Sequence, residues 1–364
     1  MAATTLAWED YARRLHPREE DIRGPYFRDQ TAIIHATPFR RLKHKTQAFF
    51  APENDHTCTR MEHVLHVATI AATICRGLNA AGWDLEPDIA YTAGLGHDLG
   101  HAPFGHAGET ALSRLLPGRV FRHEAHSLRV VNALARDGKG LNLTQAVRDG
   151  IACHNGERFE DVLCPGDPRL PEEKPPRESP PATWEGCAVR FADKVAYLGR
   201  DLEDALSMGL IAAADVPKDI RTMLGSDNGA IINTLVLDLI GHTASTGAMG
   251  FSAEKTMLAT HLYAFNTERI YRHPRLQQYE GFCHRVIEAL YAYIRAHLEC
   301  PDDNTHGDIP LNESFRSYLE KMEQFYCAAG WDAHQIVTDY IAGMTDNFAL
   351  DAMEQLSLPP FVFR

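Results

Sequence analysis

The sequence lacks the features by which three common classes of protein are recognised. No apolar run approaches the ~20 residues that a membrane-spanning helix needs. The first residues show no basic region followed by an apolar stretch, which disfavours a secretion signal. The eight cysteines are scattered and form no C-x-x-C pair, as is typical of reduced thiols. We therefore expect a cytoplasmic protein with no membrane partner.

An excess of basic residues is also missing. The chain has 36 Lys and Arg against 49 Asp and Glu, a net charge of −13, so nucleic acid is not expected as the main partner. A small polyanion is still compatible, because a metal ion and a few local basic side chains can reverse the field inside one pocket. Most of the 19 histidines lie in the first 160 residues, which indicates a functional region there.

What the sequence does contain is helical periodicity. From Met61 to Leu78, apolar residues recur at spacings of three and four and also fill a second face, so this helix is expected to be buried nearly all round. Similar patterns continue to the last one, Ala333–Met353, and predict an all-α fold. The segment Cys164–Pro181 is rich in proline, which cannot propagate a helix. We interpret it as an exposed loop, either a tolerated surface insertion or a lid over the active site.

The strongest sign of chemistry is G-H-D-L-G-H-A-P-F-G-H, residues 96–106. Adjacent His97 and Asp98 at the end of an apolar helix offer an imidazole nitrogen and a carboxylate to one point, which is half of a divalent metal site. A His-Asp pair alone is common. Here small residues that permit close backbone approach surround it, and two more histidines, His101 and His106, follow within ten residues.

Two further groups of residues could complete such a site. Arg60 and His63 lie one turn apart on the same face of the buried helix, which suggests a metal beside an anion. The common alternative for His63 is a hydrogen-bonded core histidine. Asp193, Tyr197 and Asp201 fall at i, i+4 and i+8 and form one polar stripe, which could line a pocket or face solvent.

Taken together, these motifs resemble those of the HD-domain deoxynucleotide triphosphohydrolases, which are the bacterial dGTPases and their relatives, including the vertebrate SAM-and-HD-domain dNTPase. The order His…His-Asp…Asp is carried by RMEH (60–63), GLGHDLGHAPFGHAGE (94–109) and VRFADKVAYLGRDLEDA (189–205). Matches also occur in FRRLKHKTQ (39–47) and PATWEG (181–186). The resemblance runs from about Arg23 to Leu210 and weakens beyond, where only RIYRHP (269–274) is similar.

The resemblance implies a role for each matching residue. Four residues would hold one divalent ion, Mn²⁺, Mg²⁺ or Fe²⁺: His63, His97, Asp98 and Asp193. Three residues would be catalytic: His106, Glu109 and His123. Five residues would bind substrate: Arg60 and Lys194 at the triphosphate, Tyr197 and Asp201 at the sugar, and Gln47 near the 3′-hydroxyl. In the family, a tyrosine under the sugar ring excludes a 2′-hydroxyl and so selects deoxy substrates.

The implied reaction is hydrolysis of a deoxynucleoside triphosphate, dGTP among them, to deoxynucleoside and inorganic triphosphate. Water attacks the α-phosphorus, the 5′-oxygen leaves, and His106 is the candidate that donates or shuttles the proton, with Glu109 one turn away to orient it. Two alternatives stay open. One is an HD-type nucleotidase or phosphodiesterase that acts on another phosphoester, and the other is a nucleotide-binding regulator without turnover.

The resemblance also implies an organisation of the chain. We expect an N-terminal arm and substrate-contact segment over residues 1–50 and an HD phosphohydrolase core over 51–215, which includes the exposed proline-rich loop. A helical C-terminal extension, residues 216–364, is expected to pack on that core. Because the family forms hexamers or tetramers, a homo-oligomer is expected.

Overall fold

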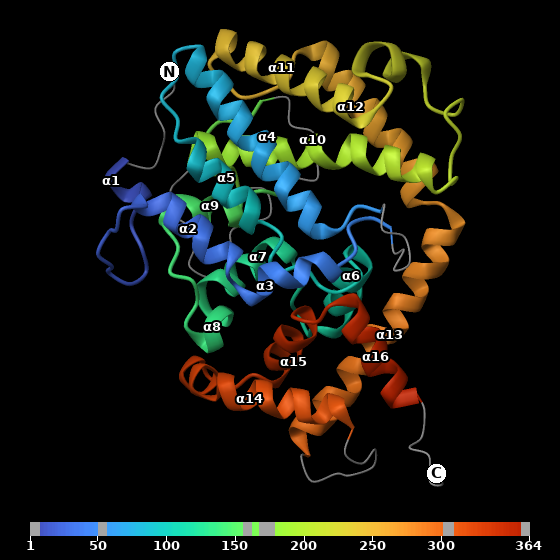
Figure 1. Ribbon diagram of the computed structural model, residues 1–364. Coiled ribbons are helices and arrows are strands. Elements are labelled where there is room, and N and C mark those ends of the chain that lie inside the picture. The colour runs from blue at the N-terminus through green and yellow to red at the C-terminus, as the bar shows by residue number, and fades with distance from the viewer. Residues whose placement is uncertain (1–7, 50–56, 156–161, 167–178, 301–308, 358–364) are drawn as a thin grey trace.

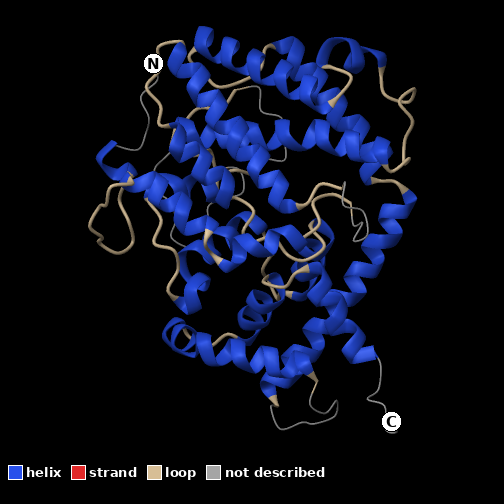
Figure 2. Ribbon diagram, viewed as in Figure 1, coloured by secondary structure: helices blue, strands red, loops and turns tan. Residues whose placement is uncertain are grey.

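The computed structural model describes residues 8–49, 57–155, 162–166, 179–300 and 309–357. Within these ranges the chain forms helices joined by loops and has only isolated β-bridges in place of strands (Figure 2). The predicted all-α fold is thus confirmed. None of the helices in these ranges is long and apolar enough to cross a membrane. The helices pack in two groups, which Figure 1 shows in the upper and lower parts of the molecule.

The first hydrophobic core lies between three central helices: α4 (Arg60–Ala80), α5 (Pro87–Gly96) and α10 (Trp184–Ser207). At the start of α4, the Thr59 side chain accepts the Glu62 N–H while the Glu62 carboxylate accepts the Thr59 N–H, a capping box. Both predicted apolar faces of α4 are buried except at Leu65, but the helix is not buried nearly all round as expected, because it has an exposed stripe formed by Glu62, Leu65, Thr69, Thr73 and Arg76. Four helices surround the central three: α2 (Gly24–Ile34), α9 (Gln145–Ala152), α11 (Asn228–Thr246) and α12 (Ala253–Asn266).

The second core surrounds the long helix α13 (Pro274–Glu299), which packs against α6 (His106–Leu115). Three further helices complete it: α14 (Pro310–Ala329), α15 (Ala333–Ala342) and α16 (Asp346–Ser357). Phe104, in the turn before α6, is buried in this core. The helices that follow residue 215 therefore belong to two different cores. Helices α11 and α12 complete the first core, and α13 to α16 form the second core together with α6.

The single helix predicted over Ala333–Met353 is wrong, because α15 and α16 are separate helices with residues 343–345 between them. The carbonyl of Gly343 accepts a hydrogen bond from Arg41 Nη1 at 2.8 Å, in place of the backbone N–H that it would accept in a continuous helix. Apolar periodicity does not reveal such a break, because both helices bury their apolar faces in the same core.

This break ties the C-terminal helices to two loops at the other end of the chain. The Asp346 carboxylate accepts hydrogen bonds from the backbone N–H of Thr46 and of Phe104, each at 2.8 Å. The buried Lys45 ammonium donates to the carbonyl of Ala342 at 2.7 Å and to the carbonyl of His101. Contacts from α15 and α16 thus fix the loop before α4 and the turn before α6.

Short helices connect the longer ones: α1 (Trp8–Tyr11), α3 (Thr37–Arg41), η1 (Leu42–His44), α7 (His123–Arg129), η2 (Val130–Leu134), α8 (Ala135–Gly138), η3 (Ile220–Leu224) and η4 (Thr267–Tyr271). Most of the predicted proline-rich loop, residues 167–178, lies outside the described residues. Near its ends, Leu163 pairs with Met249 in an isolated bridge and Gly166 N–H donates to the Pro181 carbonyl at 2.8 Å.

Candidate active site

The four predicted metal ligands come together where α4, α5 and α10 meet. His63 Nε2 lies 3.0 Å from Asp193 Oδ1, and His97 Nε2 lies 3.8 Å from the same oxygen. Asp98 Oδ2 is 3.7 Å from His97 Nε2. His63 belongs to the first turn of α4, His97 and Asp98 follow the end of α5, and Asp193 lies midway along α10. The fold therefore brings together three sequence motifs that are far apart in the chain.

His97 has the orientation and charge state of a metal ligand. Its Nδ1 donates to the Gly94 carbonyl at 2.7 Å, which leaves Nε2 as the acceptor nitrogen. Nε2 is buried and has no hydrogen-bond partner among the described residues. Burial lowers the pKa of His97 to about 4, so the imidazole is neutral at physiological pH. A neutral imidazole with a fixed N–H and a free nitrogen is what a metal ion binds.

Arg60 holds the Asp98 carboxylate from the side of α4. The two side chains form a buried ion pair between Arg60 Nη1 and Asp98 Oδ2. Burial opposes ionisation of Asp98, but the Arg60 guanidinium keeps the pKa of this carboxyl well below its usual range. Arg60 also donates to the carbonyl of Thr46 through Nε (3.2 Å) and Nη2 (3.0 Å). The guanidinium predicted to contact phosphate therefore lies beside a predicted ligand and braces the loop before α4.

The predicted catalytic residues form a connected group at the start of α6. Glu109 Oε2 lies 3.3 Å from His106 Nδ1 and 3.0 Å from His123 Nδ1. The His106 side chain is 79% exposed, whereas Glu109 and His123 are buried. Burial opposes a charge on His123, but the Glu109 carboxylate raises the pKa of His123 to about 9. The group thus consists of one carboxylate, one buried imidazolium and one imidazole that reaches solvent.

A tight turn aims His106 at this position. Phe104 and Gly105 both adopt positive φ, 63° and 62°, immediately before α6 begins. A Cβ on Gly105 would lie 3.3 Å from Arg60 Nη2 and from the Gln47 carbonyl oxygen, so a larger residue would displace the loop that carries Gln47. Glycine is needed here for its conformation and for this close approach.

Two buried histidines extend the site beyond the residues that the sequence predicted. His154 Nε2 lies 3.2 Å from His123 Nε2, and its ring centroid is 4.7 Å from that of His97. The His101 ring stacks on the His123 ring at 4.6 Å, and neither of its nitrogens has a hydrogen-bond partner among the described residues. His154 belongs to no quoted motif. It follows the end of α9 by two residues and is reached only through the packing of that helix.

Apart from Arg60, which begins α4, the predicted substrate residues lie on α10 and in the loop before α4. Asp201 Oδ2 accepts a hydrogen bond from the Tyr271 hydroxyl at 2.6 Å, and burial raises the pKa of Asp201 to about 6. Tyr197 is half-buried, and the Gln47 amide oxygen is buried without a partner among the described residues. Lys194 is buried with Nζ 5.8 Å from the centre of the Phe191 ring. Tyr271 was not predicted, although it lies within the RIYRHP motif.

The donor set fits a divalent metal ion. His63, His97 and Asp98 each offer one atom within 4.8 Å of the others, and His97, His154 and Asp193 do the same. Mixed imidazole and carboxylate donors suit Mn²⁺, Fe²⁺ or Mg²⁺ better than a metal that prefers thiolates. The unpartnered Nε2 of His97 points to a ligand that completes this cluster.

Comparison with known proteins agrees with this geometry. The HD domain model matches residues 60–198, and the phosphohydrolase-associated domain model matches residues 249–355. The chain is 38% identical over 347 residues to a deoxyguanosinetriphosphate triphosphohydrolase-like protein of Caldanaerobacter subterraneus, with coverage of 94% of this chain and 88% of the relative. Similar proteins with the same name occur in Clostridium perfringens (34% identity, 97% and 93% coverage) and a Ruegeria species (31% identity, 97% and 98% coverage).

Proposed function

The chain belongs to the HD-domain family of deoxyguanosinetriphosphate triphosphohydrolase-like proteins and is a metal-dependent phosphohydrolase, and we propose that its substrates are deoxynucleoside triphosphates, dGTP among them. The proposed products are the deoxynucleoside and inorganic triphosphate. The observation that carries the proposal is the convergence of His63, His97, Asp98 and Asp193 beside the group formed by His106, Glu109 and His123.

The first part of the proposal is one divalent ion, Mn²⁺, Mg²⁺ or Fe²⁺, held by His63, His97, Asp98 and Asp193. When bound, such an ion supplies Lewis-acid polarisation of a phosphoryl group and acidifies water. The protein contributes the orientation of the ligands, because Gly94 fixes the His97 ring and Arg60 fixes the Asp98 carboxylate. Loss of such a supporting contact typically costs roughly 10–100-fold in metal affinity or activity.

The second part concerns the proton that the leaving 5′-oxygen needs. His106 is the exposed member of the catalytic group, so it can approach a bound substrate while Glu109 fixes its ring. We assign the proton transfer at the 5′-oxygen to His106. His123 lies deeper, with Nε2 3.8 Å from Asp98 Oδ1, where a positive charge would stabilise phosphate oxygens that approach the ligands.

The third part concerns recognition of the deoxy sugar. Tyr197 and Asp201 lie one turn apart on α10, with Asp193 one turn before them. The hydroxyl of Tyr271 orients the Asp201 carboxylate. In this arrangement Tyr197 would lie against the sugar ring and exclude a 2′-hydroxyl, Asp201 and Gln47 would bind sugar hydroxyls, and Arg60 and Lys194 would supply positive charge for the triphosphate. A homo-oligomer, hexamer or tetramer, also belongs to this proposal.

One experiment tests the proposal directly. Metal-loaded protein is incubated with each of the four dNTPs and with GTP, and the products are resolved by anion-exchange chromatography. We expect deoxynucleoside and intact triphosphate from the dNTPs, and little or no turnover of GTP. Release of orthophosphate, pyrophosphate or a nucleoside monophosphate would instead favour an HD-type nucleotidase or phosphodiesterase. Binding without any product would favour a nucleotide-binding regulator.

A further inference from the structure

A separate cavity of about 590 Å³ lies between α3, α8, α14 and α15. Its wall contains none of the predicted metal, catalytic or substrate residues. The volume lies within the range of roughly 300–1,000 Å³ that is common for small-molecule sites. Part of the wall is the segment 343–345, which separates α15 from α16.

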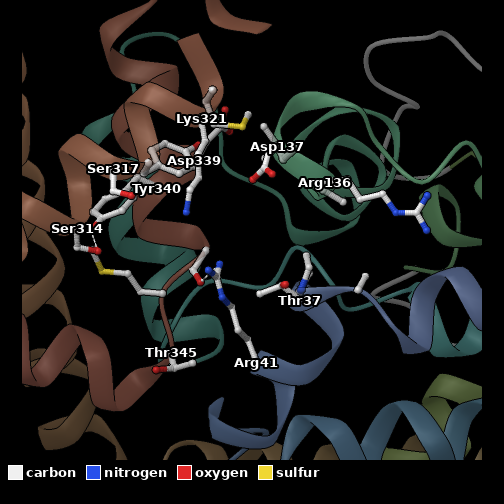
Figure 3. Close-up of a pocket in the computed structure, with 18 of the residues that line it drawn as sticks. Thr37, Arg41, Arg136, Asp137, Ser314, Ser317, Lys321, Asp339, Tyr340 and Thr345 are labelled. Carbon is white, nitrogen blue, oxygen red and sulfur yellow. Dashed lines mark hydrogen bonds between the residues drawn. The ribbon is translucent and has the colours of Figure 1, made fainter. Parts of the chain in front are cut away.

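Two cations converge on this cavity. Figure 3 shows the Arg41 guanidinium, from α3, and the Lys321 ammonium, from α14, turned toward each other across the open space. Arg41 donates to a neutral carbonyl, that of Gly343, and among the described residues neither cation forms an ion pair with a carboxylate. Arg41 and Lys321 are both exposed, and an anion between them would be attracted by each of the two cations. Two neighbouring cations without a paired carboxylate stand out in a chain with a net charge of −13.

Of the two acidic groups of the wall, one is already paired and one faces the cations. Asp339 is already neutralised, because Arg129 binds it through Nε and Nη2, at 2.9 Å and 2.7 Å. Asp137 is exposed, and its carboxylate is directed into the cavity opposite the cations (Figure 3). The cavity therefore has two cations on one side and one hydrogen-bond acceptor on the other.

The remainder of the wall suits an organic phosphate. Hydroxyl groups of Ser317, Thr37 and Thr345 lie among the lining residues and can donate to phosphate oxygens. Tyr340 and Phe348 provide aromatic surface that an inorganic ion would not use. Because one phosphate fills only a part of this volume, the chemistry favours a larger molecule with a phosphoryl group at one end and hydroxyls toward Asp137.

The backbone at the edge of the cavity is strained. Arg136 and Asp137 are consecutive non-glycine residues in the left-handed region, with φ of 56° and 55°. This conformation costs roughly 1–2 kcal/mol per residue, and such strain is concentrated at functional sites. Its effect here is visible in Figure 3, where Asp137 is turned into the cavity and Arg136 away from it.

We propose that this cavity binds a phosphorylated small molecule with free hydroxyl groups, its phosphoryl group between Arg41 and Lys321 and its hydroxyls at Asp137. The site is separate from the metal centre but shares a segment with it. Ala342, which precedes the cavity wall, accepts a hydrogen bond from Lys45, and Asp346, which follows it, holds Thr46. The wall segment 343–345 therefore lies between two residues that contact the loop that carries Gln47.

Hydrogen exchange of the full metal-loaded chain tests this site without a need for turnover. The probes are a nucleoside monophosphate (AMP), a sugar phosphate (glucose 6-phosphate) and inorganic phosphate. We expect an organic phosphate to slow exchange in α14 and α15, and Lys321→Gln to weaken this effect at least tenfold. Arg136→Gln is the matched control, because it removes a cation at the same cavity whose side chain points away. It should leave the protection unchanged.

Each result decides the proposal in one direction. A stronger effect of AMP than of glucose 6-phosphate, or the reverse, supports the proposal and identifies the source of the phosphoryl group. If inorganic phosphate gives the same protection as the two organic phosphates, the proposal that the ligand is an organic molecule is wrong. Absence of protection with all three probes, or equal binding by Lys321→Gln and wild type, would overturn the site itself. None of these readouts depends on the proposed hydrolysis.

Discussion

Glu109 binds His123 through both of its carboxylate oxygens. Oε1 accepts the backbone N–H of His123 at 3.0 Å, and Oε2 lies 3.0 Å from its Nδ1. The same Oε2 is 3.3 Å from Nδ1 of His106. One carboxylate therefore orients two imidazoles, one buried beside the predicted ligand Asp98 and one exposed to solvent. The spacing of His106 and Glu109 alone had suggested a simple pair.

Glu109→Gln should lower dGTP turnover by roughly 10²–10⁴-fold, the usual contribution of a general acid–base group. Glutamine keeps an acceptor for the His123 N–H but removes the charge that orients both rings. Turnover and metal content of the purified variant are the measurements. Glu280→Gln, an exposed carboxylate on α13, is the control and should behave as wild type. Turnover within about threefold of wild type would remove Glu109 from the catalytic group.

His106→Ala should lower turnover by a similar factor while metal content and dNTP affinity are retained, because the exposed ring is assigned to proton transfer and not to the metal. The double variant with Glu109→Gln should fall little below the stronger single variant, since residues that act as a unit are not additive. These rates are compared in one single-turnover series. If His106→Ala empties the metal site, the ring is a ligand and the assignment is wrong.

Asp193→Ala should abolish metal binding and activity but leave the fold intact. The Asp193 side chain is 20% exposed and contacts His63 and His97, so its loss removes a predicted ligand but no hydrophobic contact of the core. Metal content by elemental analysis and helix content by circular dichroism separate the two effects. Full occupancy of the metal in this variant would exclude Asp193 as a ligand.

Tyr271→Phe should raise KM for dNTPs several-fold and change kcat less. Its hydroxyl is the one donor to Asp201 among the described residues, and the other Asp201 oxygen has no hydrogen-bond partner there. A matched control is Tyr293→Phe, which also removes a hydroxyl bound to a side-chain oxygen, that of Asn312, but in the second core. Equal KM values for the two variants would contradict a role for Tyr271 in positioning Asp201.

Asp149 should make the protein less stable as the pH rises. Burial raises the pKa of Asp149 from its ordinary value of 3.8 to about 7, although its carboxylate accepts the Ala182 N–H at 2.7 Å. A folded-state pKa above the unfolded value contributes stability that is fully present below pH 4 and is lost as the pH rises through 7. The contribution is on the order of 1.4 kcal/mol for each unit of the shift.

Asp149→Asn removes this titration while it keeps an acceptor for Ala182. The free energy of unfolding, measured by urea denaturation between pH 4 and pH 8, should therefore decline less in the variant than in wild type. Parallel pH profiles for the two proteins would show that Asp149 does not titrate in this range.

The four residues that the resemblance implies as metal ligands lie close together in the structure, and their role as ligands stays a prediction. Periodicity alone left open whether His63 is a core histidine and whether the stripe of Asp193 faces solvent. His154 escaped prediction, since it reaches the cluster only through the packing of α9 on α5 and α10. Tyr271 and Asp346 were missed for the same reason, because contacts between distant segments leave no periodic signal in either segment.

The periodicity of the sequence did not predict the division into two cores either. An apolar stripe indicates that one face of a helix is buried, but it does not indicate which other helix packs against that face. For this reason the last predicted helix crossed the break at Gly343. The sequence predicted a C-terminal extension that packs on the core, but not which helices of the extension contact α10 and which contact α6, because this depends on tertiary contacts.

The bond from Asp346 to Thr46 spans 300 positions of the chain, and this has a consequence for synthesis of the protein. A ribosome that has translated the whole matched HD segment, residues 60–198, has not yet made the acceptor for the N–H groups of Thr46 and Phe104. The turn that aims His106 and the loop that carries Gln47 are therefore completed only late in translation. A nascent chain would contain all four predicted metal ligands well before these two segments are in place.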